Sequence, residues 1–288
     1  MSPRTGSLLD GEVERFHRHG FVVLEDAFTN AELEELRREA DRILRLSVNS
    51  SLANRRRHPR LDAVIDDTGN LRVRKIQPVN DLSEKIAAFS MHPRLIDPMR
   101  QLMGDEPVLM EEKLNYKQWV DLQGSDFSFL RRSFIEHFVL HHDWGYYRQQ
   151  GYPDSTLSSA LAIDDCAGKG PIRVIPGSHL IDAPLKDPDP ASGSGEVVVD
   201  TFDGARRVAL DVDAGSMVIF HSKLVHDSEP NPTREPRRMM IYSHYPRSFD
   251  PDVDPDRRNG PTRTYSRQFE DRYLKMLEAG EFEDLDVP

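Results

Sequence analysis

Cysteine is almost absent from this sequence, since Cys166 is the only one in 288 residues. A disulfide framework and a thiolate metal cluster both need several cysteines, so neither can form within the chain. Cys166 itself is expected to be inert, because no base that would activate its thiol stands near it in the sequence.

Positive charge is also scarce. Lys and Arg number 38 against 49 Asp and Glu, which gives a formal net charge of -11. This balance argues against nucleic acid or an anionic membrane as a general partner. No apolar run approaches the roughly 18 residues of a membrane-spanning helix, and no charged-then-apolar leader opens the chain. We therefore expect a soluble, cytoplasmic protein, and the pattern predicts no oligomeric state.

Prolines and glycines, in contrast, are plentiful, with 20 and 17 of them. They indicate the many turns of a loop-rich β protein. Several short apolar stretches separated by such turns favour a sandwich or barrel over alternating β-α-β units. We expect one domain, 1–288, with a helical N-terminal support at 9–104, a β core at about 105–246 and a closing helix at about 266–277.

Local patterns predict the individual elements. Thr29-Asn30-Ala31-Glu32 has the spacing of a capping box, and the apolar residues behind it predict an amphipathic helix over 30–46. Those apolar residues are Leu33, Leu36, Ala40, Ile43 and Leu44. Strands are expected at 21–24, 108–116, 155–163, 197–199, 208–210, 215–220, 224–226 and 239–242. The polar stretch 47–70 is expected to be a solvated surface, or alternatively a lid, and the interruption 121–134 a loop near the pocket mouth.

The segment His141-His142-Asp143 stands inside an apolar and aromatic run. If that run is a strand, His141 and Asp143 point the same way and His142 points to the opposite side. Such a pair supplies two of the three ligands of a 2-His-1-carboxylate iron site. The alternative is a histidine and an aspartate that merely hydrogen-bond to each other.

The candidates for a third ligand are His221, His226 and His244. His226 is favoured because Ser228 shares its face on a continuing strand. The next hairpin can then bring back an arginine, Arg237 or Arg238, beside this pair. An iron oxygenase with a bidentate carboxylate cosubstrate needs such an arginine to hold the far end of that cosubstrate.

Four ordered segments carry a resemblance. They are 141–143 (His-His-Asp), 226–237 (His-Asp-Ser, then Asn231 and Arg237), 170–179 (Gly-Pro-Ile-Arg-Val-Ile-Pro-Gly-Ser-His) and 111–117 (Glu-Glu-Lys-Leu-Asn-Tyr-Lys). Together with Gly-Phe-Val-Val at 20–23, they make the chain resemble the phytanoyl-CoA dioxygenase family of non-haem iron, 2-oxoglutarate-dependent oxygenases. The segment 111–117 is similar to the stretch that precedes the His-x-Asp element in ectoine hydroxylases.

The resemblance implies a double-stranded β-helix, a jelly-roll or cupin-like barrel that is mainly β with helices packed outside. It implies that His141, Asp143 and His226 hold Fe(II). It also implies that 2-oxoglutarate binds the same iron, with its distal carboxylate on Arg237 and Ser228, and that O2 is the second cosubstrate. Arg238 is the rival of Arg237, but neighbours on a strand point oppositely, so only one of them faces inward.

Two more residues are candidate contacts for the cosubstrate. Asn115 is predicted to contact 2-oxoglutarate, and Lys117 is either a site residue or a lysine in a salt bridge. Glu111 replaces the glutamine of the ectoine hydroxylase stretch, and a carboxylate there would repel the cosubstrate. The resemblance therefore implies no contact at Glu111.

Arg173, Trp144 and Tyr147 are the candidate substrate contacts. Each has a structural alternative, an ion pair for Arg173 and core packing for the two aromatic residues. Halogenating relatives carry a small residue where this chain has Asp143, so the resemblance favours oxidation over chlorination.

The function expected from these features is the iron- and 2-oxoglutarate-dependent oxidation of a small molecule, in specialised or antibiotic-type metabolism. Hydroxylation is the default outcome, and oxidative cyclisation is a variant of it. Two alternatives use the same residues: a jelly-roll binding module without redox activity, and a metal-dependent isomerase or hydrolase. A sugar, an amino acid, a peptide and a polyketide all stay open as substrates.

Overall fold

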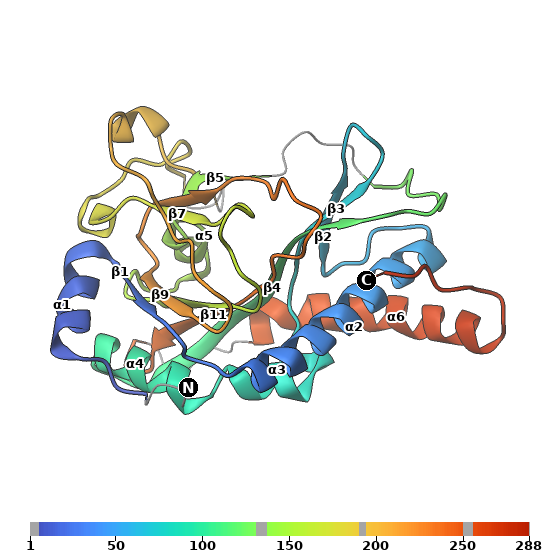
Figure 1. Cartoon of the computed structure of the whole chain (residues 1–288), viewed down its shortest axis with the longest axis horizontal. Helices are drawn as coiled ribbons and strands as arrows, with labels where there is room; N and C mark the ends of the chain where they lie inside the picture. Colours follow the sequence, from blue (N-terminus) through green and yellow to red (C-terminus); the bar gives the residue numbers. More distant parts are fainter. Residues whose placement is uncertain (1–5, 131–136, 190–193, 250–255, 288) are drawn as a thin grey trace.

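The computed structural model describes residues 6–130, 137–189, 194–249 and 256–287. Two antiparallel sheets form its centre (Figure 1). The larger sheet has the order β1 (Phe21–Leu24), β9 (Met217–His221), β6 (Leu157–Ala162), β11 (Met239–Pro246), β4 (Pro107–Val120), β3 (Leu71–Ile76) and β2 (Leu61–Ile65). The smaller sheet has the order β5 (Phe138–His141), β10 (His226–Ser228), β7 (Ile172–Val174) and β8 (Val208–Ala209).

Helices cover one side of the larger sheet. They are α1 (Asp10–His19), α2 (Asn30–Asn54), α3 (Glu84–Phe89), α4 (Pro93–Met103) and α6 (Asp256–Glu278), and the short helix α5 (Trp144–Tyr147) follows β5. In Figure 1, α2, α3, α4 and α6 gather below the sheets, while β5 and β7 lie on the opposite side. No helix in the described part of the chain is both long enough and apolar enough to cross a membrane.

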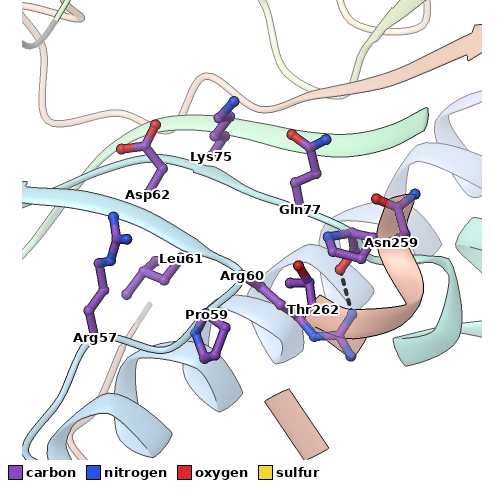
Figure 2. Close-up of a pocket in the computed structure, with 10 residues that line it drawn as sticks. Arg57, Pro59, Arg60, Leu61, Asp62, Lys75, Gln77, Asn259 and Thr262 are labelled. Carbon is purple, nitrogen blue, oxygen red and sulfur yellow. Dashed lines mark hydrogen bonds between the residues drawn. The ribbon is translucent and has the colours of Figure 1, made fainter. Parts of the chain in front are cut away.

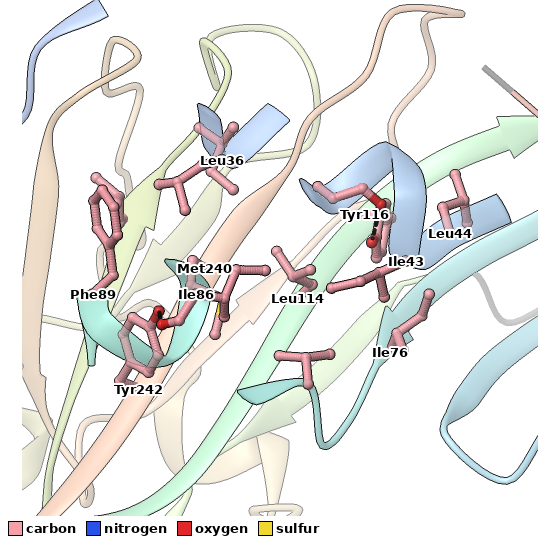
Figure 3. Packing of buried hydrophobic residues seen from close by; sticks show 14 of the residues in the cluster. Leu36, Ile43, Leu44, Ile76, Ile86, Phe89, Leu114, Tyr116, Met240 and Tyr242 are labelled. Atoms are coloured by element: carbon pink, nitrogen blue, oxygen red, sulfur yellow. Dashed lines mark hydrogen bonds between the residues drawn. The ribbon is translucent and has the colours of Figure 1, made fainter. Parts of the chain in front are cut away.

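Strand alternation builds two separate cores from the larger sheet. On β11, Met240 and Tyr242 face the helices, whereas Met239 and Ile241 face the smaller sheet. Figure 3 shows Met240 and Tyr242 beside residues of the helices, among them Leu36. Each large apolar side chain buried in this way contributes roughly 1.5–3 kcal/mol relative to exposure. Both faces of the sheet are therefore covered, and the site forms on the face away from the helices.

The predicted amphipathic helix is confirmed. Thr29 accepts from the backbone N–H of Glu32, whose carboxylate in turn accepts from the Thr29 backbone, as a capping box requires. All five predicted apolar positions of this helix are fully buried. The predicted strands at 21–24, 215–220 and 239–242 are also present.

The prediction for 47–70 is wrong, because helix α2 continues to Asn54 and a hairpin of β2 and β3 follows. The polar end of α2 is buried because distant segments satisfy it. Asn49 exchanges two hydrogen bonds with the backbone of Leu285, and Asn54 donates to the carbonyl of Phe269. Partners so far away in sequence leave no local pattern. The segment 9–104 therefore adds three strands to the sheet and is more than a helical support.

One loop prediction and one strand prediction are not met in the described residues. In the described part of 121–134, Phe127 and Leu130 are buried in the helix-side core, and the cavity beside the candidate metal centre is lined by none of residues 121–130. Arg131 and Arg132 lie outside the described residues. The stretch 197–199 is not a strand, since only Val197 makes an isolated bridge and a 3-10 turn begins at Val199.

A buried ion pair joins β11 to the segment after β6. Arg238 donates from Nε to Oδ2 of Asp164 at 2.7 Å and from Nη2 to Oδ1 at 3.0 Å. Burial by itself would raise the pKa of the Asp164 carboxyl, but its hydrogen bonds with Arg238 hold the pKa below its usual value. The ionised form is therefore favoured by folding.

Replacing Asp164 by asparagine is expected to lower the free energy of unfolding at pH 7 by about 3 kcal/mol, because Arg238 loses its more buried charge partner and keeps only the more exposed Asp41. A lowered pKa stabilises the folded state above the unfolded pKa, near 4, and that contribution is lost as the pH falls further. Urea unfolding of wild type and Asp164→Asn at pH 7 and pH 3 measures this. A gap between the two proteins that stays constant with pH would contradict it.

Candidate metal centre

His141 and His226 are brought together by strand pairing. The antiparallel register of β5 and β10 places them directly opposite each other, with ring centroids 4.2 Å apart. Nδ1 of His141 lies 2.6 Å from the carbonyl oxygen of Val139, and Nδ1 of His226 lies 2.9 Å from that of Leu224. A carbonyl oxygen only accepts, so each Nδ1 carries the proton and each Nε2 keeps its lone pair for a metal.

Asp143 lies beside the two histidines because of a turn, and not because of strand alternation. Strand β5 ends at His141, and Asp143 has helical backbone angles at the start of α5. The turn still places its Oδ1 3.7 Å from Nε2 of His141 and 4.0 Å from Nε2 of His226. The three ligand atoms lie within 4.8 Å of one another. They form a 2-His-1-carboxylate set that could hold one metal ion.

A close backbone contact fixes this turn. The backbone N–H of His142 donates to the carbonyl of Gly195 at 3.0 Å. A Cβ atom at Gly145 would lie only 2.4 Å from the Cα of Gly195, so a larger residue would force the two segments apart. The Gly195 segment therefore holds the start of α5, and with it Asp143, in place.

The protonation states of the ligands suit a cation. Burial, reinforced by the neighbouring His226, lowers the pKa of His141 to about 3. Burial by itself would raise the pKa of Asp143, but Lys113 and the two histidines hold it below its usual value. Neutral imidazole and ionised carboxylate are the forms that bind metal ions.

A chain of buried hydroxyl groups supports the second oxygen of Asp143. Ser158 Oγ lies 3.4 Å from Asp143 Oδ2, Ser243 Oγ lies 2.8 Å from Ser158 Oγ, and the Tyr147 hydroxyl lies 3.1 Å from Ser243 Oγ. Ser158 and Ser243 are paired on β6 and β11. Neither serine was predicted from the sequence. Their signal is a polar residue at an inward position of an otherwise apolar strand.

Replacing Ser158 by alanine is expected to weaken Fe(II) binding about 10-fold, because Asp143 loses the hydroxyl that orients it. The matched control is Ser159→Ala, since Ser159 is equally buried, belongs to the same strand and donates to the carbonyl of Tyr242 instead. Fe(II) titration under anaerobic conditions compares the two. Equal affinities in both variants would exclude this role for Ser158.

The other candidate histidines lie elsewhere. His244 is fully buried with its Nε2 3.2 Å from the carbonyl oxygen of Ser90, and the ring of His221 packs 5.4 Å from that of His179. His142 stacks on Trp144 and does not border the cavity, as expected from its position. Within the described residues, the only set of three potential ligands that meets this spacing is the one at His141, Asp143 and His226.

A cavity of about 380 Å³ opens beside the three ligands. Of the predicted contacts, Asn115, Ser228 and Tyr147 line it. Oδ1 of Asn115 is buried without a hydrogen-bond partner among the described residues, so this amide is available to a ligand. Tyr146 and Phe220, which the sequence analysis did not select, also line the cavity.

Two buried basic side chains, Arg237 and Lys117, meet at the carbonyl oxygen of Gly170. Arg237 is 1% exposed and donates from Nη2 to the carbonyl of Gly170 at 3.1 Å, and no carboxylate of the described residues forms an ion pair with it. Lys117 donates to the same carbonyl at 2.8 Å and to that of Glu229. Burial, and then the neighbouring Arg237, lower the pKa of Lys117 to about 6. A buried charge without a partner is costly, which favours an anionic ligand nearby.

Position 170, whose carbonyl oxygen accepts from Arg237 and Lys117, requires a glycine. Its φ is +69° and a Cβ atom would lie 2.4 Å from the carbonyl oxygen of Glu229, so only glycine fits there. Arg238, the rival of Arg237, is occupied by its ion pairs with Asp164 and Asp41. The prediction that only one of the two arginines faces inward is thus consistent with their contacts.

Four of the predicted contacts do not border this cavity: Arg237, which is described above, and three others. Lys117 donates to backbone carbonyls, which is a structural role. Arg173 forms ion pairs with Asp227 and Glu229, the structural alternative weighed for it. Trp144 stacks on His142. None of the three is among the residues that line the cavity.

Glu111 is neutralised inside the cavity. Nζ of Lys113 lies 2.7 Å from Oε1 of Glu111, and both residues line the cavity wall. Burial alone would lower the pKa of Lys113, but Glu111 raises it above its usual value. The ion pair removes the repulsion that the sequence analysis expected between Glu111 and an anionic cosubstrate.

Comparison with known proteins bears on the fold and the chemistry. The model of the phytanoyl-CoA dioxygenase (PhyH) family matches residues 16–239. The chain is 25% identical over 253 residues to the ectoine dioxygenase of Halomonas elongata, covering 82% of this chain and 70% of that protein. It is 27% identical over 265 residues to the L-proline trans-4-hydroxylase of Streptomyces griseoviridis, covering 82% and 86%.

Solved structures agree with these relatives. The structure of EctD from S. alaskensis with bound Fe matches with a TM-score of 0.60 and 25% identity, covering 84% of this chain and 78% of that chain. This likeness confirms the predicted jelly-roll fold with helices outside.

Proposed function

Because the chain belongs to the phytanoyl-CoA dioxygenase family, we propose that it is an iron- and 2-oxoglutarate-dependent dioxygenase acting on a small molecule. His141, Asp143 and His226 are the proposed iron ligands. The observation that carries the proposal is their geometry, in which both Nε2 atoms and one carboxylate oxygen lie within 4.8 Å. With each Nδ1 bonded to a backbone carbonyl, both lone pairs are oriented before any metal arrives.

The cosubstrate is supported by the unpaired charge of Arg237. A dicarboxylate that reaches from the metal toward Gly170 would neutralise this guanidinium and satisfy its Nε, which has no partner among the described residues. Ser228, on the same strand as His226, lines the cavity and can donate to a carboxylate. We therefore assign Arg237 and Ser228 to the distal carboxylate of 2-oxoglutarate.

When bound, iron and 2-oxoglutarate couple the decarboxylation of the cosubstrate to succinate and CO2 with the insertion of one oxygen atom of O2 into the substrate. The chain itself orients the reactants and excludes water. Tyr146, Tyr147 and Phe220 supply apolar walls beside the ligands. Asp143 occupies the third ligand position, so hydroxylation is the proposed outcome, with oxidative cyclisation as its variant.

A small organic substrate fits the cavity beside the ligands. Its volume of about 380 Å³ lies in the range of small-molecule sites. The named relatives are enzymes of ectoine and of L-proline, both small molecules. A substrate from specialised or antibiotic-type metabolism, as expected from the sequence, stays a prediction.

Succinate formation tests the proposal directly. Purified protein with Fe(II), ascorbate and 2-oxoglutarate is expected to release succinate, slowly without substrate and faster when a substrate is present. Anaerobic titrations should show one Fe(II) and one 2-oxoglutarate per chain. A non-redox binding module, or an isomerase or hydrolase that uses the metal alone, would be indifferent to 2-oxoglutarate. The absence of both binding and turnover would overturn the proposal.

A further inference from the structure

A second hollow adjoins the cavity of the candidate metal centre. This groove of about 330 Å³ lies between the β2–β3 hairpin and the beginning of α6. Asp62, Lys75 and Gln77 line both the groove and the cavity, so these three side chains form a shared border. Figure 2 shows Arg57 at the Asp62 end of the groove and Asn259 of α6 at the Gln77 end.

The groove is cationic in an acidic protein. Three cations and one carboxylate line it, although the whole chain has a formal net charge of -11. Arg60 is occupied, since it forms a two-point ion pair with Asp81. Oδ1 of Asp62 lies 4.0 Å from Nη1 of Arg74. Asp62 of β2 also stands opposite Lys75 of β3, but these two side chains form no ion pair.

Lys75 is the unneutralised charge at the border. It has no hydrogen-bond or ion-pair partner among the residues that the structure describes, whereas Lys113 in the same cavity is paired with Glu111. Burial, and then the nearby Lys113, lower the pKa of Lys75 from its usual value. Both effects oppose a positive charge. The carboxylates of Glu111 and Asp62 offset them only in part, because the pKa stays lowered, and an anion at this place would relieve them further.

The strand fixes where Lys75 points. Lys75 stands on β3 between Asn115 of β4 and Asp62 of β2. Gln77, two residues later, stands on the same side, as Figure 2 shows for the two labelled side chains. A lysine ammonium and a carboxamide N–H are thus presented side by side from a paired sheet, and such rigid support suits a binding contact.

We propose that Lys75 and Gln77 form a subsite for an anionic group of the substrate, a carboxylate or a phosphate ester. This subsite rests on the proposed function, because it deepens the same cavity. The substrate would place its anion at the border with the groove and its oxidised carbon beside His141, Asp143 and His226. Arg57, exposed at the groove, would attract that group from solvent.

Titration with simple anions tests the subsite before any substrate is known. The protein is loaded with Ni(II) and the unreactive analogue N-oxalylglycine, which fills the cosubstrate position, at low ionic strength. Acetate and inorganic phosphate are then titrated into wild type, Lys75→Ala, Lys75→Arg and the control Lys85→Ala. Lys85 is a half-exposed lysine paired with Glu35 on the surface, so its loss changes the net charge equally.

Lys75→Ala is expected to bind the preferred anion at least tenfold more weakly than wild type and Lys85→Ala, while Lys75→Arg keeps most of the affinity. If acetate binds more tightly, the anionic group of the substrate is a carboxylate; if phosphate binds more tightly, it is a phosphate ester. Equal affinity in all four proteins, or no anion binding by wild type, would overturn the subsite. Failure to bind Ni(II) and N-oxalylglycine would instead count against the proposed function, so the two failures are distinguishable.

Discussion

Replacing His141 by alanine is expected to abolish Fe(II) binding and succinate formation. The variant keeps only Asp143 and His226, so the metal ion loses one of its three protein ligands. The loss of affinity should exceed roughly 100-fold, because even the removal of a residue that only orients a ligand costs 10–100-fold. Anaerobic Fe(II) titration and a succinate assay measure the two effects separately.

The matched control for this experiment is His221→Ala. His221 was a rival ligand in the sequence and is the partly buried last residue of β9, but its ring packs against His179. Fe(II) affinity in this variant should stay at the wild-type level. If His221→Ala lost the metal while His141→Ala retained it, the assignment of the three ligands would be wrong.

Replacing Arg237 by methionine is expected to raise the KM for 2-oxoglutarate roughly 100-fold. Removing one partner of a buried charge pair costs about 2–5 kcal/mol of binding free energy, and 2.8 kcal/mol corresponds to ~100-fold. Fe(II) affinity should change little, since Arg237 does not contact the three ligands. Steady-state kinetics with varied 2-oxoglutarate give the result.

Stability distinguishes this role from a structural one. Without a ligand, Arg237 is a buried cation that no described carboxylate neutralises, so Arg237→Met should not lower the Tm of the free protein. The rise in Tm that 2-oxoglutarate gives the wild type should disappear. Arg238→Met should behave in the opposite way, losing Tm with its Asp164 pair but keeping the KM for 2-oxoglutarate. A large loss of Tm in Arg237→Met would contradict the proposed role.

Local pattern predicted much of the scaffold. The capping box at Thr29 and the apolar spacing from Leu33 to Leu44 predicted the first long helix, because both signals depend only on neighbours within a few residues. The end of that helix, residues 47–54, escaped prediction. Its buried Asn49 is satisfied by Leu285, a partner that only the folded chain brings near.

Part of the candidate site was likewise predictable from local sequence, and part was not. The order of His141, Asp143, His226, Ser228 and Arg237 along the chain predicted the candidate site, since each stands in a short motif. The reason given for Asp143 was wrong, because the strand stops at His141 and a turn held by Gly195 aims the carboxylate. Lys117 shared the same kind of motif, yet its positive φ of 44° directs it to backbone carbonyls.

The sequence by itself determined the chemistry that this protein could support, because residue types and their spacing within one element are local properties. Only the tertiary structure decided which charges are left unpaired. Arg238 is paired with Asp164 on a distant segment, whereas no carboxylate of the described residues forms an ion pair with Arg237. Such neighbours are set by the burial of distant segments against one another, and no periodicity of a single strand contains them.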